Sequence, residues 1–176
     1  MSKLEAGEVE TEHKPFDLRD VLQGAETVVS AQAADCGIVF TSDPPAGEHW
    51  HLLSSPLNIQ RVLQNIMSNA VKYNRPGGSV RVELAQGQEK CIIHVSDTGC
   101  GIPEEYQQSI FHPFFRVDKS RSREYGGAGL GLSLVWEIAD LHGGSVWVEE
   151  SSDKGTTIAV ELPAGTESDP SSADIP

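Results

Sequence analysis

The residues best suited to chemistry in this sequence begin with a glycine run at residues 125–135, YGGAGLGLSLV. Four glycines in six positions are followed at once by an apolar segment. Such density needs a reason, because glycine loses more conformational entropy on folding than any other residue. A glycine-rich loop that leads into a helix directs several free N–H groups to one place, with the helix dipole behind them. The run therefore predicts a phosphate-binding loop.

The glycine spacing excludes two common nucleotide-binding motifs. No Gly-Lys-Ser/Thr follows the run, as a P-loop requires. Gly127, Gly129 and Gly131 are followed by Leu132, at the place where a dinucleotide fingerprint carries its third glycine. The run is therefore a phosphate-binding loop of some other class.

A basic segment lies beside the glycine run in an otherwise acidic chain. The formal net charge is −13, which argues against a nucleic-acid partner, because phosphate backbones are bound by lysine and arginine. Between residues 111 and 126, starting at Arg116, four basic residues outnumber two acidic ones. This segment predicts a small anionic ligand, and an ordinary solvated loop is the alternative.

Two asparagines one helical turn apart form a second candidate site. In residues 57–74, LNIQRVLQNIMSNAVKYN, apolar residues recur at helical spacing, and Asn65, Asn69, Lys72 and Tyr73 share another face. Amide oxygens are suitable ligands for a hard cation such as Mg²⁺, and Lys72 would contact a phosphate as a point charge. Tyr73 would flank a base. The alternative is a solvated polar helix face.

An aspartate at the end of an expected strand is the third candidate. Asp97 opens the segment DTGCGIP, with Gly99 and Gly101 two and four positions later. A carboxylate can accept a hydrogen bond from the amino group of adenine, whereas the guanine carbonyl would leave the buried charge unpaired. The alternative is an Asx-turn with flexible glycines.

Hydrophobic periodicity places these motifs on a plan of helices and strands. We expect helices at residues 18–34, 56–73 and 129–142, with a short one from Pro103, and strands at 38–42, 48–53, 79–85, 90–96, 145–150 and 156–162. This order predicts an α+β fold: a two-layer α/β sandwich with a mixed, mostly antiparallel sheet and helices on one face.

Four motifs in order give the sequence a family resemblance. NIMSNAVKY, DTGCGI, FHPFFR and GGAGLGL resemble the N, G1, F and G2 boxes of the catalytic, ATP-binding domain of bacterial sensor histidine kinases, in the superfamily of gyrase, Hsp90 and MutL. The resemblance implies a Bergerat-type fold over residues 14–163. Residues 1–13 resemble the end of the family's dimerisation helix, and the polar tail at 164–176 is expected to be disordered.

The resemblance also implies a role for each matched position. Asn65 and Asn69 would hold Mg²⁺, and Asn65 and Arg116 would be the catalytic residues, with Arg116 near the γ-phosphate. The residues implied to bind ATP lie in or beside the boxes: Asn69, Lys72, Tyr73, Asp97, Gly99, Gly101, Ile102, Gly127, Gly129, Leu130, Gly131, Leu132 and Thr156.

The resemblance further predicts what the domain does with ATP. Related ATPases carry Glu where this chain has Asn65, and an amide cannot take a proton from water. Hydrolysis should therefore be slow, and ATP would be kept for γ-phosphoryl transfer to a protein histidine, driven by positioning and charge neutralisation. None of the six histidines has the context of the family's phosphoacceptor. His142 is instead expected at a helix end, where the dipole favours its charge.

These features define the expected partners and the alternatives. The acceptor histidine would lie on a separate dimerisation domain of a longer parent, with a response regulator downstream, and this chain alone would be monomeric. Scattered cysteines and no signal peptide favour a cytoplasmic setting, with a parent that is membrane-anchored or not. The alternatives are a degenerate nucleotide-binding module and a serine kinase of the same superfamily.

Overall fold

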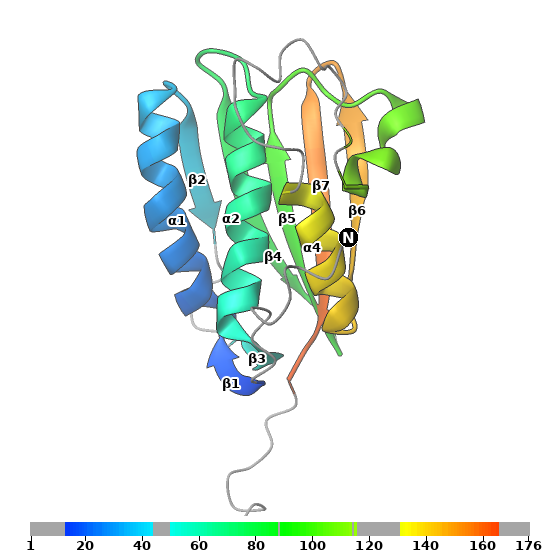
Figure 1. The fold of residues 1–176 in the computed structure, drawn as a ribbon. Coiled ribbons are helices and arrows are strands. Elements are labelled where there is room, and N and C mark those ends of the chain that lie inside the picture. The colour runs from blue at the N-terminus through cyan, green and yellow to red at the C-terminus, as the bar shows by residue number, and fades with distance from the viewer. Residues whose placement is uncertain (1–12, 44–49, 88, 114, 116–130, 166–176) are drawn as a thin grey trace, which may run out of the picture.

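The computed structural model describes residues 13–43, 50–87, 89–113, 115 and 131–165 of the 176. Helices α1, α2 and α4 lie together on one side of a sheet (Figure 1). The elements follow in the order β1 (Lys14–Asp17), α1 (Leu18–Asp35), β2 (Val39–Asp43), β3 (His51–Ser54), α2 (Pro56–Lys72), β4 (Ser79–Gln86), β5 (Lys90–Asp97), η1 (Glu104–Tyr106), η2 (Ser109–Phe111), α4 (Gly131–Leu141), β6 (Ser145–Ser152) and β7 (Gly155–Pro163).

The main sheet has five strands in the order β2-β4-β5-β7-β6. Neighbouring strands are antiparallel except β2 and β4, which are parallel. The three helices cover one face, and the other face carries polar side chains such as Arg81, which pairs with Asp43 at 3.1 Å. The predicted two-layer sandwich, with a mixed, mostly antiparallel sheet and helices on one face, is confirmed.

A second, two-stranded sheet was not expected from the sequence. The predicted strand at 48–53 is β3, but it pairs with β1 and not with the main sheet, and Phe16 lies opposite Leu52. β1 itself was missed because its four residues, KPFD, are too short to show alternation. The backbone N–H of Leu18 donates to the carbonyl of Trp50 at 2.7 Å, which ties the start of α1 to the same small sheet.

Helix α2 is the central helix of the layer and carries the two asparagines. Ser55 caps its first turn by accepting from the N–H of Asn58, and Pro56 opens it. One face is fully buried against the sheet: Ile59, Val62, Leu63, Ile66 and Met67. Asn65 and Asn69 lie beside this face and are half-buried. Packing of the apolar stripe therefore determines the direction in which the amides point.

The two predicted hairpins are present and form the centre and one edge of the main sheet. In β4 and β5 every second side chain is buried: Val80, Val82, Leu84, Cys91, Ile93 and Val95. β6 and β7 pair with a bulge between Val148 and Glu150. The helix predicted at 129–142 is α4, described from Gly131. Its first two predicted residues lie outside the described part of the chain.

Candidate functional site

The first helix residue of α4 lies against the two asparagines of α2. A Cβ added at Gly131 would lie 3.4 Å from Asn65 Oδ1 and 3.8 Å from Asn69 Nδ2. The structure therefore brings together two motifs that are more than sixty residues apart in the sequence. The N-terminus of a helix favours negative charge, because its first N–H groups have no partner within the helix. Amide groups and a helix N-terminus side by side can bind a metal–phosphate group.

Asp97, at the end of β5, is held by two backbone donors. The N–H of Gly99 donates to Asp97 Oδ1 at 2.8 Å, and the N–H of Thr156 donates to the same oxygen at 3.3 Å. Among the described residues no group donates to Oδ2. Burial raises the pKa of the Asp97 carboxyl, and the two N–H donors offset this only in part. The site thus presents a partly desolvated acceptor that would gain from a ligand N–H donor.

The loop after Asp97 is shaped by two glycines that approach other backbone closely. A Cβ at Gly99 would lie 2.5 Å from the carbonyl oxygen of Tyr73, the residue that caps the end of α2. Gly101 has φ +77°, and a Cβ there would overlap the carbonyl oxygen of Ser152 in β6. Both glycines are therefore required by the fold of this loop. They join the end of α2, the aspartate and the β6–β7 hairpin into one unit.

A third glycine of this unit was not singled out from the sequence. Gly155 opens β7 with φ +141°, and a Cβ there would overlap the carbonyl oxygen of Asp97. The only signal in the sequence was its place directly before Thr156, in GTT. Its contact with Asp97 depends on the pairing of β5 with β7, in which Asp97 lies opposite Thr156.

Thr156 and Ile102 are connected through a serine that was also missed. Thr156 is buried, and its hydroxyl shares a hydrogen bond of 2.8 Å with that of Ser151. The same Ser151 oxygen accepts from the N–H of Ile102 at 2.8 Å. Thr156 therefore contacts Asp97 through its backbone and the glycine loop through its side chain. Asp97 and Thr156 also border a cavity of about 170 Å³ at the end of the sheet.

The remaining predicted residues lie near the asparagines of α2, near the Asp97 loop, or outside the described part of the chain. Lys72 is the last residue of α2, and Tyr73, which caps it, is 50% exposed. Leu132 is half-buried against the core at the start of α4. Four predicted residues lie outside the described part of the chain: Arg116, Gly127, Gly129 and Leu130. Their proposed roles stay predictions.

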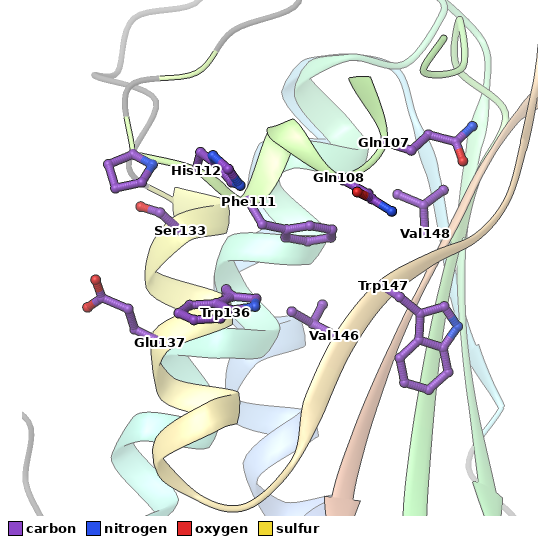
Figure 2. Close-up of a pocket in the computed structure, with 11 residues that line it drawn as sticks. Gln107, Gln108, Phe111, His112, Ser133, Trp136, Glu137, Val146, Trp147 and Val148 are labelled. Carbon is purple, nitrogen blue, oxygen red and sulfur yellow. The ribbon is translucent and has the colours of Figure 1, made fainter. Parts of the chain in front are cut away.

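A larger cavity lies away from this site. It has a volume of about 710 Å³ and lies between α4, β6 and the segment around η2, where none of the predicted site residues lines it (Figure 2). The candidate site is thus identified by its polar groups and close backbone contacts, and not by cavity size.

Comparison with known families identifies the fold. Residues 54–166 match the family described as "Histidine kinase-, DNA gyrase B-, and HSP90-like ATPase", and this range is more than half of the chain. The chain belongs to this family. It is an ATP-binding domain of the histidine kinase-like ATPase type, as the resemblance of the four motifs predicted.

Similar proteins of the histidine kinase-like ATPase family are sensor kinases. The chain is 33% identical over 167 residues to the circadian input-output histidine kinase CikA of Synechococcus elongatus, covering 94% of this chain and 22% of CikA. The solved catalytic domain of the histidine kinase ThkA is 27% identical with a TM-score of 0.76, covering 87% of this chain and 96% of that domain. Full-length ShkA in complex with AMPPNP is 25% identical with a TM-score of 0.80, and the match covers 94% of this chain and 34% of ShkA.

The chain spans about a fifth to a third of the length of curated relatives such as CikA. Within the described residues, none of the helices is both long and apolar enough to span a membrane.

His142, directly after α4, is buried, and burial together with the nearby His13 lowers its pKa. The predicted position of His142 at a helix end is confirmed, but desolvation lowers its pKa and so opposes the charged form that the helix dipole would favour.

Proposed function

We propose that this chain is the kinase domain of a two-component sensor histidine kinase, which binds Mg-ATP and positions it for γ-phosphoryl transfer to a histidine on a separate dimerisation domain. The observation that carries the proposal is the Asp97 carboxylate, held at one oxygen and without a donor at the other among the described residues. Its partly desolvated state is costly unless a ligand donates to it.

At the base end, Asp97 would accept from the exocyclic amino group of adenine. An N–H donor at Oδ2 offsets the desolvation that raises the Asp97 pKa, whereas a guanine carbonyl would not. Gly99 and Gly101 would shape the loop beside the base, with Ile102 and Tyr73 next to it. Thr156 would hold the aspartate in position and contact the water around it.

At the phosphate end, Asn65 and Asn69 would hold Mg²⁺ through their amide oxygens, directly or through water. Their proximity to Gly131 at the start of α4 supports this role, because the metal and the phosphates would meet a helix N-terminus. Lys72 would neutralise phosphate charge. When bound, Mg²⁺ supplies charge neutralisation of the triphosphate.

The glycine-rich segment completes the proposed phosphate site. Gly127, Gly129, Leu130 and Leu132 would form the wall and hinge of the phosphate loop, and Arg116 would approach the γ-phosphate. Because Asn65 stands where related ATPases have Glu, no side chain at that position can take a proton from water. We therefore expect slow hydrolysis and transfer to histidine as the main use of ATP.

The proposal includes the domain arrangement and the partners. Residues 14–163 would form the catalytic domain, residues 1–13 would be the end of the parent's dimerisation helix, and residues 164–176 would be a disordered tail. The partners are that dimerisation domain and a response regulator, and this chain alone is a monomer in the cytoplasm. No phosphoacceptor histidine is present, so this chain does not autophosphorylate by itself.

The test is calorimetric titration of ATP with and without Mg²⁺, followed by addition of the parent's dimerisation domain. We expect Mg-dependent ATP binding and label transfer from γ-labelled ATP to the added histidine, as an acid-labile phosphoramidate. Base-labile, acid-stable label would instead indicate a serine acceptor. ATP binding without transfer would indicate a degenerate module, and absence of ATP binding would refute the proposal.

A further inference from the structure

A second site lies on the side of α4 away from the asparagines of α2. Figure 2 shows a cavity between α4 and β6, closed at one end by η2. Its volume is about 710 Å³, and three aromatic side chains line it: Phe111, Trp136 and Trp147. Trp136 is 49% exposed although it is large and apolar. We call this cavity, between α4, β6 and η2, the α4–β6 groove.

One wall of the groove is the free edge of a sheet. β6 is the last strand of the five and pairs only with β7 among the described residues. Val146 and Val148 face the helices, whereas Trp147 points to the opposite face, and all three line the groove. The groove therefore reaches around the strand edge. An edge strand offers N–H and C=O groups that an incoming strand can pair with.

The combination of an edge strand and a facing helix selects a type of ligand. An extended peptide that pairs with β6 would direct alternate side chains toward α4, where Trp136 and Phe111 provide an apolar surface. The bulge between Val148 and Glu150 interrupts regular pairing. The added strand would therefore be short and would pair with the Ser145–Val148 part of β6.

The charge around the groove indicates the sign of the ligand. Elements η1, η2, α4 and β6 contain no lysine or arginine within their described bounds, and they carry six acidic residues: Glu104, Glu105, Glu137, Asp140, Glu149 and Glu150. Of these, Glu149 is paired with His94 of β5 at 2.8 Å. Glu137 lines the groove itself. Basic side chains flanking the apolar ones would be attracted to this surface.

We propose that the α4–β6 groove binds an extended, basic segment of a partner protein, which adds as a short strand to β6 and places a large apolar side chain against Trp136. A second copy of this chain is the less suitable occupant, because two chains of formal charge −13 repel each other. The site is separate from the nucleotide site, and the proposal does not depend on ATP binding.

The test is an NMR titration of the isotope-labelled chain with a short synthetic peptide, blocked at both ends, in which lysine or arginine alternates with leucine or valine. We expect shifts of the Val146, Trp147 and Val148 amides and of the Trp136 indole, with slower amide exchange along β6. The control is a peptide analogue with a methyl group on every backbone nitrogen, so that the protein itself carries no substitution. This analogue should not bind, because it has no backbone N–H to donate to β6.

Two variants and two matched controls test the side chains. Trp136→Ala should weaken peptide binding about tenfold, and Glu137→Lys about threefold or more. Val28→Ala, on an exposed position of α1, and Glu89→Lys, in the β4–β5 turn, should leave binding unchanged. All four variants should bind ATP with the same affinity as the chain without substitutions.

Five results would overturn the proposal, and four of them come from the peptide titrations. These are no binding of the basic peptide, equal binding of the N-methylated analogue, shifts confined to surfaces away from β6 and α4, and equal binding of a peptide in which glutamate replaces the basic residues. Concentration-dependent self-association through β6 would also contradict it, because the groove would then hold a second copy of this chain.

Discussion

Replacing Asp97 by asparagine should weaken ATP binding while leaving the free domain more stable. The two backbone donors, Gly99 and Thr156, can bond to an amide oxygen as well as to a carboxylate. The substitution therefore keeps the loop and removes one partly buried charge. The adenine amino group, however, would lose a hydrogen bond to a charged acceptor, which contributes about 1.5–3 kcal/mol.

This magnitude corresponds to a loss of about tenfold to 150-fold in ATP affinity. The stability effect has the opposite sign. Because burial raises the pKa of Asp97, the ionised carboxylate destabilises the native state above that pKa. The variant should thus have the larger free energy of unfolding near neutral pH. The difference in free energy of unfolding between the two proteins should disappear as the pH falls through the raised native pKa of Asp97 toward the ordinary aspartate value of about 3.9.

Two assays on the same samples check this reasoning. Calorimetry measures ATP affinity, and urea denaturation without nucleotide measures stability as a function of pH. Glu89→Gln, an exposed carboxylate-to-amide change, is the matched control and should change neither quantity. Unchanged ATP affinity in Asp97→Asn would refute the adenine contact, and a less stable variant at neutral pH would refute the assignment of Asp97 as a costly buried charge.

Three further predictions concern the scaffold. Gly101→Ala should destabilise the domain by at least about 3 kcal/mol and abolish ATP binding, because its Cβ would overlap the Ser152 carbonyl at a positive φ; denaturation and calorimetry measure both effects. Leu63→Ala, fully buried on α2, should lower the free energy of unfolding by about 2–5 kcal/mol in urea, whereas Leu57→Ala, 43% exposed, should have little effect. Burial lowers the pKa of His142, so the native state favours the neutral imidazole. The free energy of unfolding therefore has the full contribution of His142 above about pH 6.5 and loses it as the pH falls through the native pKa. His142→Gln should flatten this part of the pH–stability curve.

Matched controls make these predictions specific. Gly37 also has positive φ, +67°, but a Cβ there would meet nothing within 4 Å. Gly37→Ala should therefore cost only the backbone strain of about 1–2 kcal/mol, and equal effects at Gly37 and Gly101 would contradict the proposed close approach to β6. Equal effects of Leu63→Ala and Leu57→Ala would contradict the packing of α2. A pH–stability curve that His142→Gln leaves unchanged would contradict the desolvation of that histidine.

The local elements and the order of the motifs were predictable from the sequence. The periodicity around Leu63 and the alternation in β4 and β5 reflect single elements that each bury one face, so they are visible in a short window of residues. The start of α2 was likewise predicted at residue 56, where the structure has Pro56 as the first residue of the helix. β1 was missed for the opposite reason, because four residues carry too little pattern.

The arrangement of the site was decided by tertiary structure. Gly155 is an ordinary hairpin residue until β5 pairs with β7 and brings its backbone against Asp97. The parallel pairing of β2 with β4 likewise joins segments whose register no local signal specifies. Such contacts depend on pairing between strands that are distant in the sequence. The register of that pairing is selected because it buries the apolar face of every strand against the helices.

The sequence by itself therefore determined which chemical groups this protein has and the elements that carry them. Its local periodicities and motif order were sufficient for the fold class and the family. Only the tertiary structure decided which groups meet: Gly131 beside Asn65, and Trp136 across a groove from the free edge of β6. The physical reason is that secondary structure follows from neighbours in sequence, whereas close approach depends on how the buried faces of distant elements pack.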